Sequence, residues 1–262
     1  MEKDSKWILP ENLRKQEERE KDEVEKGICD GGGDFGSYYA YRKGINFGFI
    51  EPHAFSDDKK ALVYTKNIQA YLNSVNLKLE GKILDVGCAI GTITNAIYIL
   101  NKNVCGGGTN GIDISEDAIL LAKQKYPNCK FYKQSADELD NFENGYFDII
   151  HCREFYPFTR TNNEQYHMKY LDLFCKKLKP HGFVILEMCA LDKGLCNTYM
   201  ELDNQLKKVG YSVVKRNIEI PNKLFRIFGA LSYKRPFYDL FKLLTRVFPR
   251  HRFGFFYILT KQ

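Results

Sequence analysis

Apolar and polar residues alternate along the chain in two patterns. Short apolar runs predict buried strands, and stretches with apolar residues three and four positions apart predict helices. We expect strands at 83–86, 111–114, 130–133, 147–152, 183–188, 211–219 and 255–262. We expect helices at 59–75, 92–100, 116–125, about 163–178 and 198–209. The sequence LKPHG at 178–182 predicts the end of a helix and a turn into the next strand.

Strands that alternate with helices predict an α/β fold. Short apolar strands of this kind form a mostly parallel sheet with helices on both faces. We therefore expect a Rossmann-like, doubly wound sheet of seven strands. The chain then divides into a charged arm with an N-terminal cap (1–58), an α/β core (59–220), a basic helical insertion (221–253) and a final core strand (254–262).

Charge is concentrated in the insertion. The whole chain has a net charge of +6, and residues 221–253 contain eight Lys or Arg residues and one acid, Asp239. Within this insertion, apolar residues from Phe237 to Phe248 fall on one helical side and basic residues on another, which predicts an amphipathic basic helix. Residues 11–26 mix both charge signs and are typical of a solvated helix or a mobile arm.

Composition also indicates the cellular compartment of the protein and the state of its cysteines. No apolar run has the length of a spanning helix, and the N-terminus has no apolar signal core. We therefore expect a cytoplasmic protein, in which the eight cysteines are reduced thiols. No His or Cys cluster has zinc spacing, so we expect no metal site.

The stretch KILDVGCAIGTITNAI, residues 82–97, predicts a strand, a glycine-containing turn and a helix. Such turns bring backbone N–H groups to a ligand at the carboxyl edge of a sheet. A dinucleotide site of the G-x-G-x-x-G type needs a third glycine where this chain has Thr92. Asp85 just before the turn would also repel a pyrophosphate, and it suits a ligand that is cationic instead.

The segment LDVGCAIG resembles motif I of the class I S-adenosylmethionine-dependent methyltransferases, with Ala89 in place of the middle glycine. GIDIS, QSADEL, GYFDIIHC and LKPHGFVILE resemble later elements of that family, so the resemblance covers about residues 60–220. It implies S-adenosyl-L-methionine as cofactor, with Asp113 on the ribose hydroxyls and Ile114 on the adenine. The residues implied in cofactor binding are Tyr39, Arg42, Asp85, Gly87, Cys88, Gly91, Asp113, Ile114, Ser135, Ala136, Asp137 and Cys152.

The loop HCREFYPFTR after the fourth strand is expected to face the methyl acceptor. Many relatives have a histidine base where this chain has Phe158, so the catalytic candidates here are His151, Arg153, Glu154 and Tyr156. Each has a structural alternative. His151 is equally consistent with a histidine satisfied by neighbouring strands, and Tyr156 with a core residue.

Arg153 and Arg160 would bind an anionic group or pair with Glu154 and Glu164. In the cap, SYYAYR resembles an element of small-molecule methyltransferases. There, Tyr38, Tyr39 and Arg42 would close over the cofactor's methionine carboxylate, and Glu51 and His53 would face the acceptor or pack the cap.

The basic insertion points to the substrate class. We expect a lid that recruits a small anionic acceptor for O-methylation, such as a phosphorylated or nucleotide-linked sugar. The chain also resembles methyltransferases of bacterial surface polysaccharides, for which a capsule phosphoramidate group is one such acceptor. The alternatives are a membrane surface with a lipid or quinone acceptor, a dimer contact and, last, RNA binding. Two further hypotheses are a non-catalytic regulator that binds the cofactor and an NAD-dependent dehydrogenase. We expect the protein to be a monomer or a homodimer.

Overall fold

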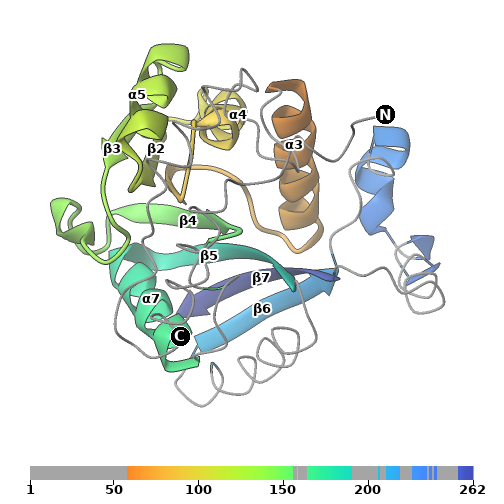
Figure 1. The fold of residues 1–262 in the computed structure, drawn as a ribbon. Coiled ribbons are helices and arrows are strands. Elements are labelled where there is room, and N and C mark those ends of the chain that lie inside the picture. Colours follow the sequence, from red (N-terminus) through yellow and green to blue (C-terminus); the bar gives the residue numbers. More distant parts are fainter. Residues whose placement is uncertain are drawn as a thin grey trace, which may run out of the picture.

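Within the described part of a computed structural model of the chain, a seven-stranded sheet is flanked by helices (Figure 1). The structure describes residues 58–155, 158, 164–190, 206, 211–218, 226–234, 236–237, 239–240 and 253–261. The strands are β1 (Lys82–Val86), β2 (Gly108–Asp113), β3 (Lys130–Lys133), β4 (Phe147–Arg153), β5 (Leu178–Ala190), β6 (Tyr211–Ile218) and β7 (Phe253–Lys261). The helices are α3 (Asp58–Ser74), α4 (Thr92–Asn101), α5 (Glu116–Lys125) and α7 (Glu164–Lys177), with 3-10 turns η2 (Leu139–Asn141) and η3 (Gly229–Tyr233).

The strands lie in the order β3-β2-β1-β4-β5-β7-β6. Strands β1 to β5 pair in parallel, and β7 runs antiparallel between β5 and β6. The predicted fold, a doubly wound and mostly parallel sheet, is confirmed. The strand order reverses between β1 and β4, and ligands of such sheets bind at the carboxyl ends of the strands beside that point.

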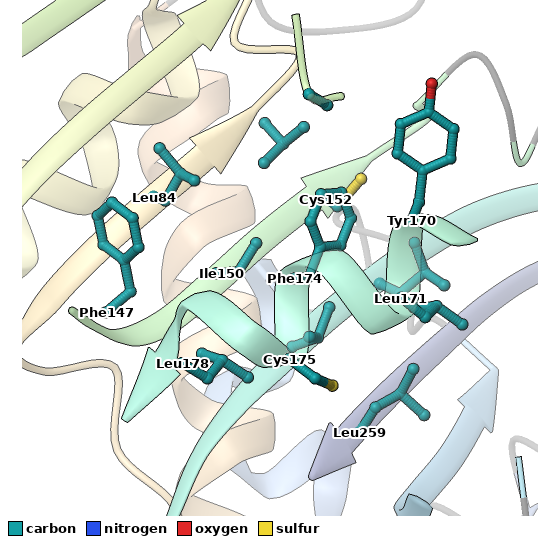
Figure 2. Packing of buried hydrophobic residues seen from close by; sticks show 14 of the residues in the cluster. Leu84, Phe147, Ile150, Cys152, Tyr170, Leu171, Phe174, Cys175, Leu178 and Leu259 are labelled. Atoms are coloured by element: carbon teal, nitrogen blue, oxygen red, sulfur yellow. The ribbon is translucent and has the colours of Figure 1, made fainter. Parts of the chain in front are cut away.

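Successive residues of the central strands face opposite sides of the sheet, as strand geometry requires. Leu84, Ile150 and Val184 lie in the core cluster that α7 covers with residues such as Phe174 (Figure 2). Ile83, Ile149 and Ile185 lie in a second cluster, under α3 and α4. Side chains at odd positions of β1, β4 and β5 therefore face α3 and α4, which decides where the polar residues near the strand ends meet.

Two features differ from the sequence-based expectation or lie beyond it. The LKPHG segment belongs to β5, which begins at Leu178. In place of a turn, the pairing of β5 with β4 shifts register here, and His181 has a left-handed backbone with φ 65°. The cap, most of the predicted helix at 198–209, and residues 241–252 of the insertion lie outside the described residues. In the portion that is described, no helix is both long and apolar enough to cross a bilayer.

Candidate functional site: the carboxyl edge of β1, β2 and β4

The turn between β1 and α4 contains three residues in the left-handed region. Gly87 has φ 71°, Ala89 has φ 48° and Gly91 has φ 78°. The N–H groups of Gly87 and Cys88 both donate to the carbonyl of Ile112 on β2, at 2.9 Å. The turn is thereby fixed to the neighbouring strand, at the edge of the sheet where the sequence predicts the cofactor.

Glycine is required at 91 for two reasons. A left-handed φ disfavours a side chain, and a Cβ there would lie 2.6 Å from Cζ of Phe131. At Gly111 on β2, a Cβ would lie 2.8 Å from Sγ of Cys88. A Cβ at Gly87, in contrast, would approach only Phe155, at 3.6 Å. The turn therefore packs closely against β2 and β3 around Gly91, whereas at Gly87 a Cβ would make only an ordinary contact.

Asp113 ends β2 with its carboxylate held on both sides. Oδ2 accepts the N–H of Ala89 at 2.8 Å, and Oδ1 accepts the N–H of Ser115 at 2.9 Å. Ser115 in turn caps α5 by accepting the N–H of Ala118. Each carboxylate oxygen can accept a second hydrogen bond. The carboxylate is thus held in a fixed orientation, and its predicted contact with the ribose stays a prediction.

The predicted adenine loop follows β3. Ala136 is buried, Ile114 is partly buried at the end of β2, and Ser135 accepts the N–H of Asp137 at 3.3 Å. The Asp137 carboxylate already binds α7, because Oδ2 accepts the Tyr170 hydroxyl at 2.9 Å and Oδ1 pairs with Lys169 at 2.9 Å. Asp137 therefore anchors the loop to α7, and its predicted contact with the adenine stays a prediction.

Asp85 lies beneath the turn, on the side of the sheet that α3 and α4 cover, and it is 3% exposed. Its Oδ2 accepts the hydroxyl of Thr94 at 2.6 Å, and its Oδ1 lies 2.7 Å from Nδ1 of His151. Both carboxylate oxygens are therefore engaged by protein groups. Asp85 thus has a structural role beneath the turn, and its predicted contact with the cofactor stays a prediction.

A chain of hydrogen bonds continues from His151 to the end of β5. Nε2 of His151 lies 3.2 Å from the hydroxyl of Tyr64 on α3, and that hydroxyl donates to Oε2 of Glu187. The same Oε2 accepts Nε–H of Arg153 at 3.0 Å. The Arg153 guanidinium also lies over the Tyr64 ring, 4.9 Å from its centre. Polar groups from α3, β1, β4 and β5 thus form one buried network.

This network shows where three residues of the predicted acceptor side lie. His151 is fully buried with both ring nitrogens in contact with protein groups, so the alternative of a histidine satisfied by its neighbours describes its position. Arg153 pairs with Glu187 across the β4–β5 register, a partner that the sequence did not suggest. Phe158, at the position of the histidine found in relatives, is buried and stacks on His167.

The loop that leaves β4 begins with a strained residue. Glu154 has φ 49°, and its N–H donates to the carbonyl of Glu187 at 2.9 Å. Phe155 then turns inward against Tyr170 and Phe174. Two other predicted residues of this loop, Tyr156 and Arg160, lie outside the described residues. The same is true of the predicted cap residues Tyr38, Tyr39, Arg42, Glu51 and His53.

Three thiols near the site are neutral at physiological pH. Burial raises the pKa of Cys88 and of Cys152 well above the ordinary value, and nearby carboxylates, Asp85 among them, raise both further. Burial first and Asp85 second raise the pKa of Cys129 to about 12. Cys88 and Cys152 are therefore uncharged groups at this edge, and their predicted contact with the cofactor stays a prediction.

Sequence reasoning missed Tyr64, Thr94 and Glu187. Glu187 could have been found from the sequence, because it is an acid at the end of the otherwise apolar segment FVILE. Tyr64 and Thr94 lie among the apolar positions of two helices, where nothing in the pattern marks them as polar partners.

The match to a family model extends from residue 77 to residue 237 and is described as a methyltransferase domain. The chain belongs to this methyltransferase-domain family. The match includes the glycine turn, Asp113 and the β4 end, and it bears out the predicted cofactor, S-adenosyl-L-methionine. The match does not extend to the two narrower predictions, the surface-polysaccharide subtype and methylation on oxygen.

The methyltransferase is similar to curated enzymes from Campylobacter jejuni subsp. jejuni named ubiquinone/menaquinone biosynthesis C-methyltransferase UbiE. The serotype O:2 protein is 27% identical over 171 residues, which span 63% of this chain and 63% of that enzyme. The serotype O:6 protein is 26% identical over 183 residues, or 68% of each. The match to the first relative thus covers less than two thirds of its length.

Solved structures share the fold at low identity. The [4+2]-cyclase SpnF matches with a TM-score of 0.56 and 13% identity, covering 87% of this chain and 95% of that one. Magnesium protoporphyrin IX methyltransferase from Synechocystis PCC 6803, solved with bound SAM, matches with a TM-score of 0.53 and 15% identity, covering 93% and 97%. The two neighbours have different activities, so the fold alone does not assign the acceptor.

The residues of the edge fit S-adenosylmethionine. A Cβ at Gly87 would meet no atom closer than 3.6 Å, and the Asp113 carboxylate, held by two backbone N–H groups, suits a ribose. Asp85 beneath the turn disfavours phosphate and favours a cation.

Proposed function

We propose that this methyltransferase transfers the methyl group of S-adenosyl-L-methionine to a small-molecule acceptor at the carboxyl edge of β1 and β4. The observation that supports this most directly is Asp113, whose two oxygens are oriented by the backbone of the turn and of α5. When bound, the cofactor supplies an electrophilic methyl carbon on a sulfonium. The chain's own part is to hold the ribose through Asp113, to fit the turn around the ligand, and to align the acceptor.

For the acceptor, we propose a small anionic molecule that is methylated on oxygen. The excess of basic residues in 221–253 supports this class, since a concentration of positive charge on a protein attracts anionic molecules. Arg153 contributes less to it than the sequence suggested, because Glu187 offsets its charge. Phosphorylated sugars, nucleotide-linked sugars and phosphoramidates of surface polysaccharides are the acceptors to test first.

A second candidate is C-methylation of a quinone ring. The similarity to the two Campylobacter C-methyltransferases favours it, at 27% and 26% identity. The basic insertion would then lie on an anionic membrane surface, where such an acceptor is found.

Methyl transfer from cofactor labelled with ¹³C in the methyl group tests both candidates. The protein is incubated with phosphorylated sugars, nucleotide sugars, a phosphoramidate and a short-chain quinol, and S-adenosylhomocysteine is quantified. NMR of the product then separates an O–CH₃ carbon from a ring C–CH₃ carbon. Binding of S-adenosylhomocysteine without turnover of any acceptor would favour a non-catalytic regulator. Binding of NAD without binding of S-adenosylhomocysteine would overturn the proposal.

A further inference from the structure

The three most exposed large apolar side chains in the described part of the chain lie in one short segment. They are Ile227 at 71%, Leu231 at 58% and Leu240 at 55%. We call residues 226–240 the surface segment; its described part is helical at 226–228, continues into η3 and is helical again at 237 and 239–240. A cluster of exposed apolar side chains is typical of an interaction site.

Tyr233 fixes the surface segment to α3. Its hydroxyl donates to Oδ1 of Asn67, and its ring centre lies 5.3 Å from that of Tyr71. Asn67 and Tyr71 are both buried, and Tyr233 packs against the core cluster under α3. Figure 1 shows the segment in blue beside α3. One side of the segment is therefore bound to the protein, while Ile227 and Leu231 remain exposed.

A ring contact joins the two ends of the surface segment. The ring centres of Phe228 and Phe237 lie 4.5 Å apart, and Phe228 is still 37% exposed. Leu240 follows Phe237 by three positions, and its N–H donates to the carbonyl of Pro236 at 3.0 Å. The apolar residues before and after η3 are thus held near one another, and they form one surface.

The charge beside these apolar side chains is positive. Arg226 and Lys234 are exposed, and neither forms an ion pair with any residue that the structure describes. Residues 221–253 contain eight Lys or Arg residues and one acid. Cations next to exposed apolar side chains are typical of proteins that bind anionic bilayers, because the cations attract the headgroups while the apolar groups enter the acyl boundary.

The same features argue against two other occupants. A symmetric contact with a second copy of the chain would bring like charges together. RNA would pair with the cations and stack on aromatic rings, but the three most exposed side chains are aliphatic and would stay in water. An anionic bilayer satisfies both kinds of side chain at once.

We propose that the surface segment docks the protein on an anionic lipid bilayer. Ile227, Leu231 and Leu240 insert at the level of the headgroups, and Arg226 and Lys234 lie against the lipid phosphates. The inference goes beyond the proposed function and does not depend on it, because it concerns where the protein binds and not which acceptor is methylated.

The anchor of the surface segment lies on the same side of α3 as a residue of the candidate site. Tyr64, Asn67 and Tyr71 are three and four positions apart, so they share one side of the helix. The Tyr64 hydroxyl donates to Glu187 at the carboxyl end of β5, and Asn67 accepts the Tyr233 hydroxyl about one turn further along. A bilayer bound to the segment would therefore lie beside the helix that borders the candidate site.

Co-sedimentation of the full chain with lipid vesicles tests the inference. Vesicles of phosphatidylcholine alone are compared with vesicles of phosphatidylcholine and phosphatidylglycerol in equal amounts. We expect binding to the mixed vesicles only, and weaker binding as salt screens the cations. The double variant Ile227→Ser/Leu231→Ser should lose about tenfold or more in vesicle affinity. Arg226→Gln/Lys234→Gln should lose about fivefold for each charge removed.

Ile99→Ser/Leu120→Ser is the matched control. These two side chains are 40% and 50% exposed on α4 and α5, outside the surface segment, so the variant should bind vesicles as the wild type does. Ile227→Ser/Leu231→Ser should unfold at the temperature of the wild type, because both side chains are exposed. A lower unfolding temperature without any binding of the wild type to vesicles would show that another part of the chain covers the segment, and would overturn the inference.

Other results would also contradict docking on an anionic bilayer. These are equal binding to both kinds of vesicle, undiminished binding of Ile227→Ser/Leu231→Ser, a wild-type homodimer that this variant dissociates, and binding of single-stranded RNA without binding of vesicles. Hydrogen exchange of the wild type needs no variant, and mixed vesicles should slow it at 226–234 but not in α5. None of these results bears on S-adenosylhomocysteine binding, whose absence would overturn the proposed function alone.

Discussion

Asp85 and His151 are register partners on β1 and β4, and their side chains meet at 2.7 Å where the strand order of the sheet reverses. This contact joins the two halves of the doubly wound sheet directly below the glycine turn. The acid that ends the first strand therefore has a structural task, which is to fix β4 beside the turn, as well as an electrostatic one.

Replacement of Asp85 by Asn should destabilise the fold. The carboxylate accepts hydrogen bonds from Thr94 and His151, and an amide offers one acceptor and one donor in the same space. We expect a loss of about 1–3 kcal/mol in the free energy of unfolding, measured by urea denaturation. The control Asp140→Asn, at a side chain that is 98% exposed, should change it by less than about 0.5 kcal/mol. Equal effects of the two substitutions would show that the buried contact is not stabilising.

Replacement of Asp113 by Ala should weaken binding of S-adenosylhomocysteine. A charge-assisted hydrogen bond contributes about 1.5–3 kcal/mol, which corresponds to a loss of affinity of about 10- to 150-fold in calorimetric titration. Glu116→Gln is the control, because Glu116 lies three residues away, is exposed, and pairs with Lys133. Unchanged affinity in Asp113→Ala would rule out the ribose contact.

The two glycines of the turn should respond differently to alanine. Gly91→Ala places a Cβ 2.6 Å from Phe131 in a left-handed conformation, so we expect a loss of about 2–4 kcal/mol in stability. Gly87→Ala keeps the left-handed strain without the overlap, and we expect about 1–2 kcal/mol. Thermal unfolding of both variants measures the difference. A larger loss for Gly87→Ala would mean that the turn packs differently.

The elements and the cofactor turn could be predicted from the sequence because both depend on local patterns. The bounds predicted for β3 and α5 agree with the structure, since the spacing of apolar residues marks them. The buried chain of hydrogen bonds from Asp85 through His151 and Tyr64 to Glu187 could not be predicted. Tyr64 and His151 are 87 positions apart, and only the docking of α3 on β1, β4 and β5 brings them together. An apolar helix pattern cannot distinguish a tyrosine in the core from one whose hydroxyl reaches a buried acid.

The buried thiols should be protected from alkylation while the protein is folded. The pKa of Cys129 is raised to about 12, and those of Cys88 and Cys152 are raised well above normal, so little thiolate forms at pH 8. Cys105 is exposed and should react with iodoacetamide before Cys88, Cys129 and Cys152, as peptide mapping by mass spectrometry will show. Rapid labelling of Cys88 in the native protein would contradict the packing of the turn against Gly111.

Arg153 and Glu187 offer a test of the network as a unit. Arg153→Ala leaves the Glu187 carboxylate, whose side chain is 2% exposed, without its cation, and we expect a stability loss of about 3 kcal/mol. Adding Glu187→Gln removes the stranded charge, so the double variant should be more stable than the sum of the two single losses predicts. Binding of S-adenosylhomocysteine to Arg153→Ala should stay close to that of the wild type, while the acceptor KM rises. Urea denaturation of the four proteins measures the coupling, and strict additivity would show that Arg153 and Glu187 do not act together.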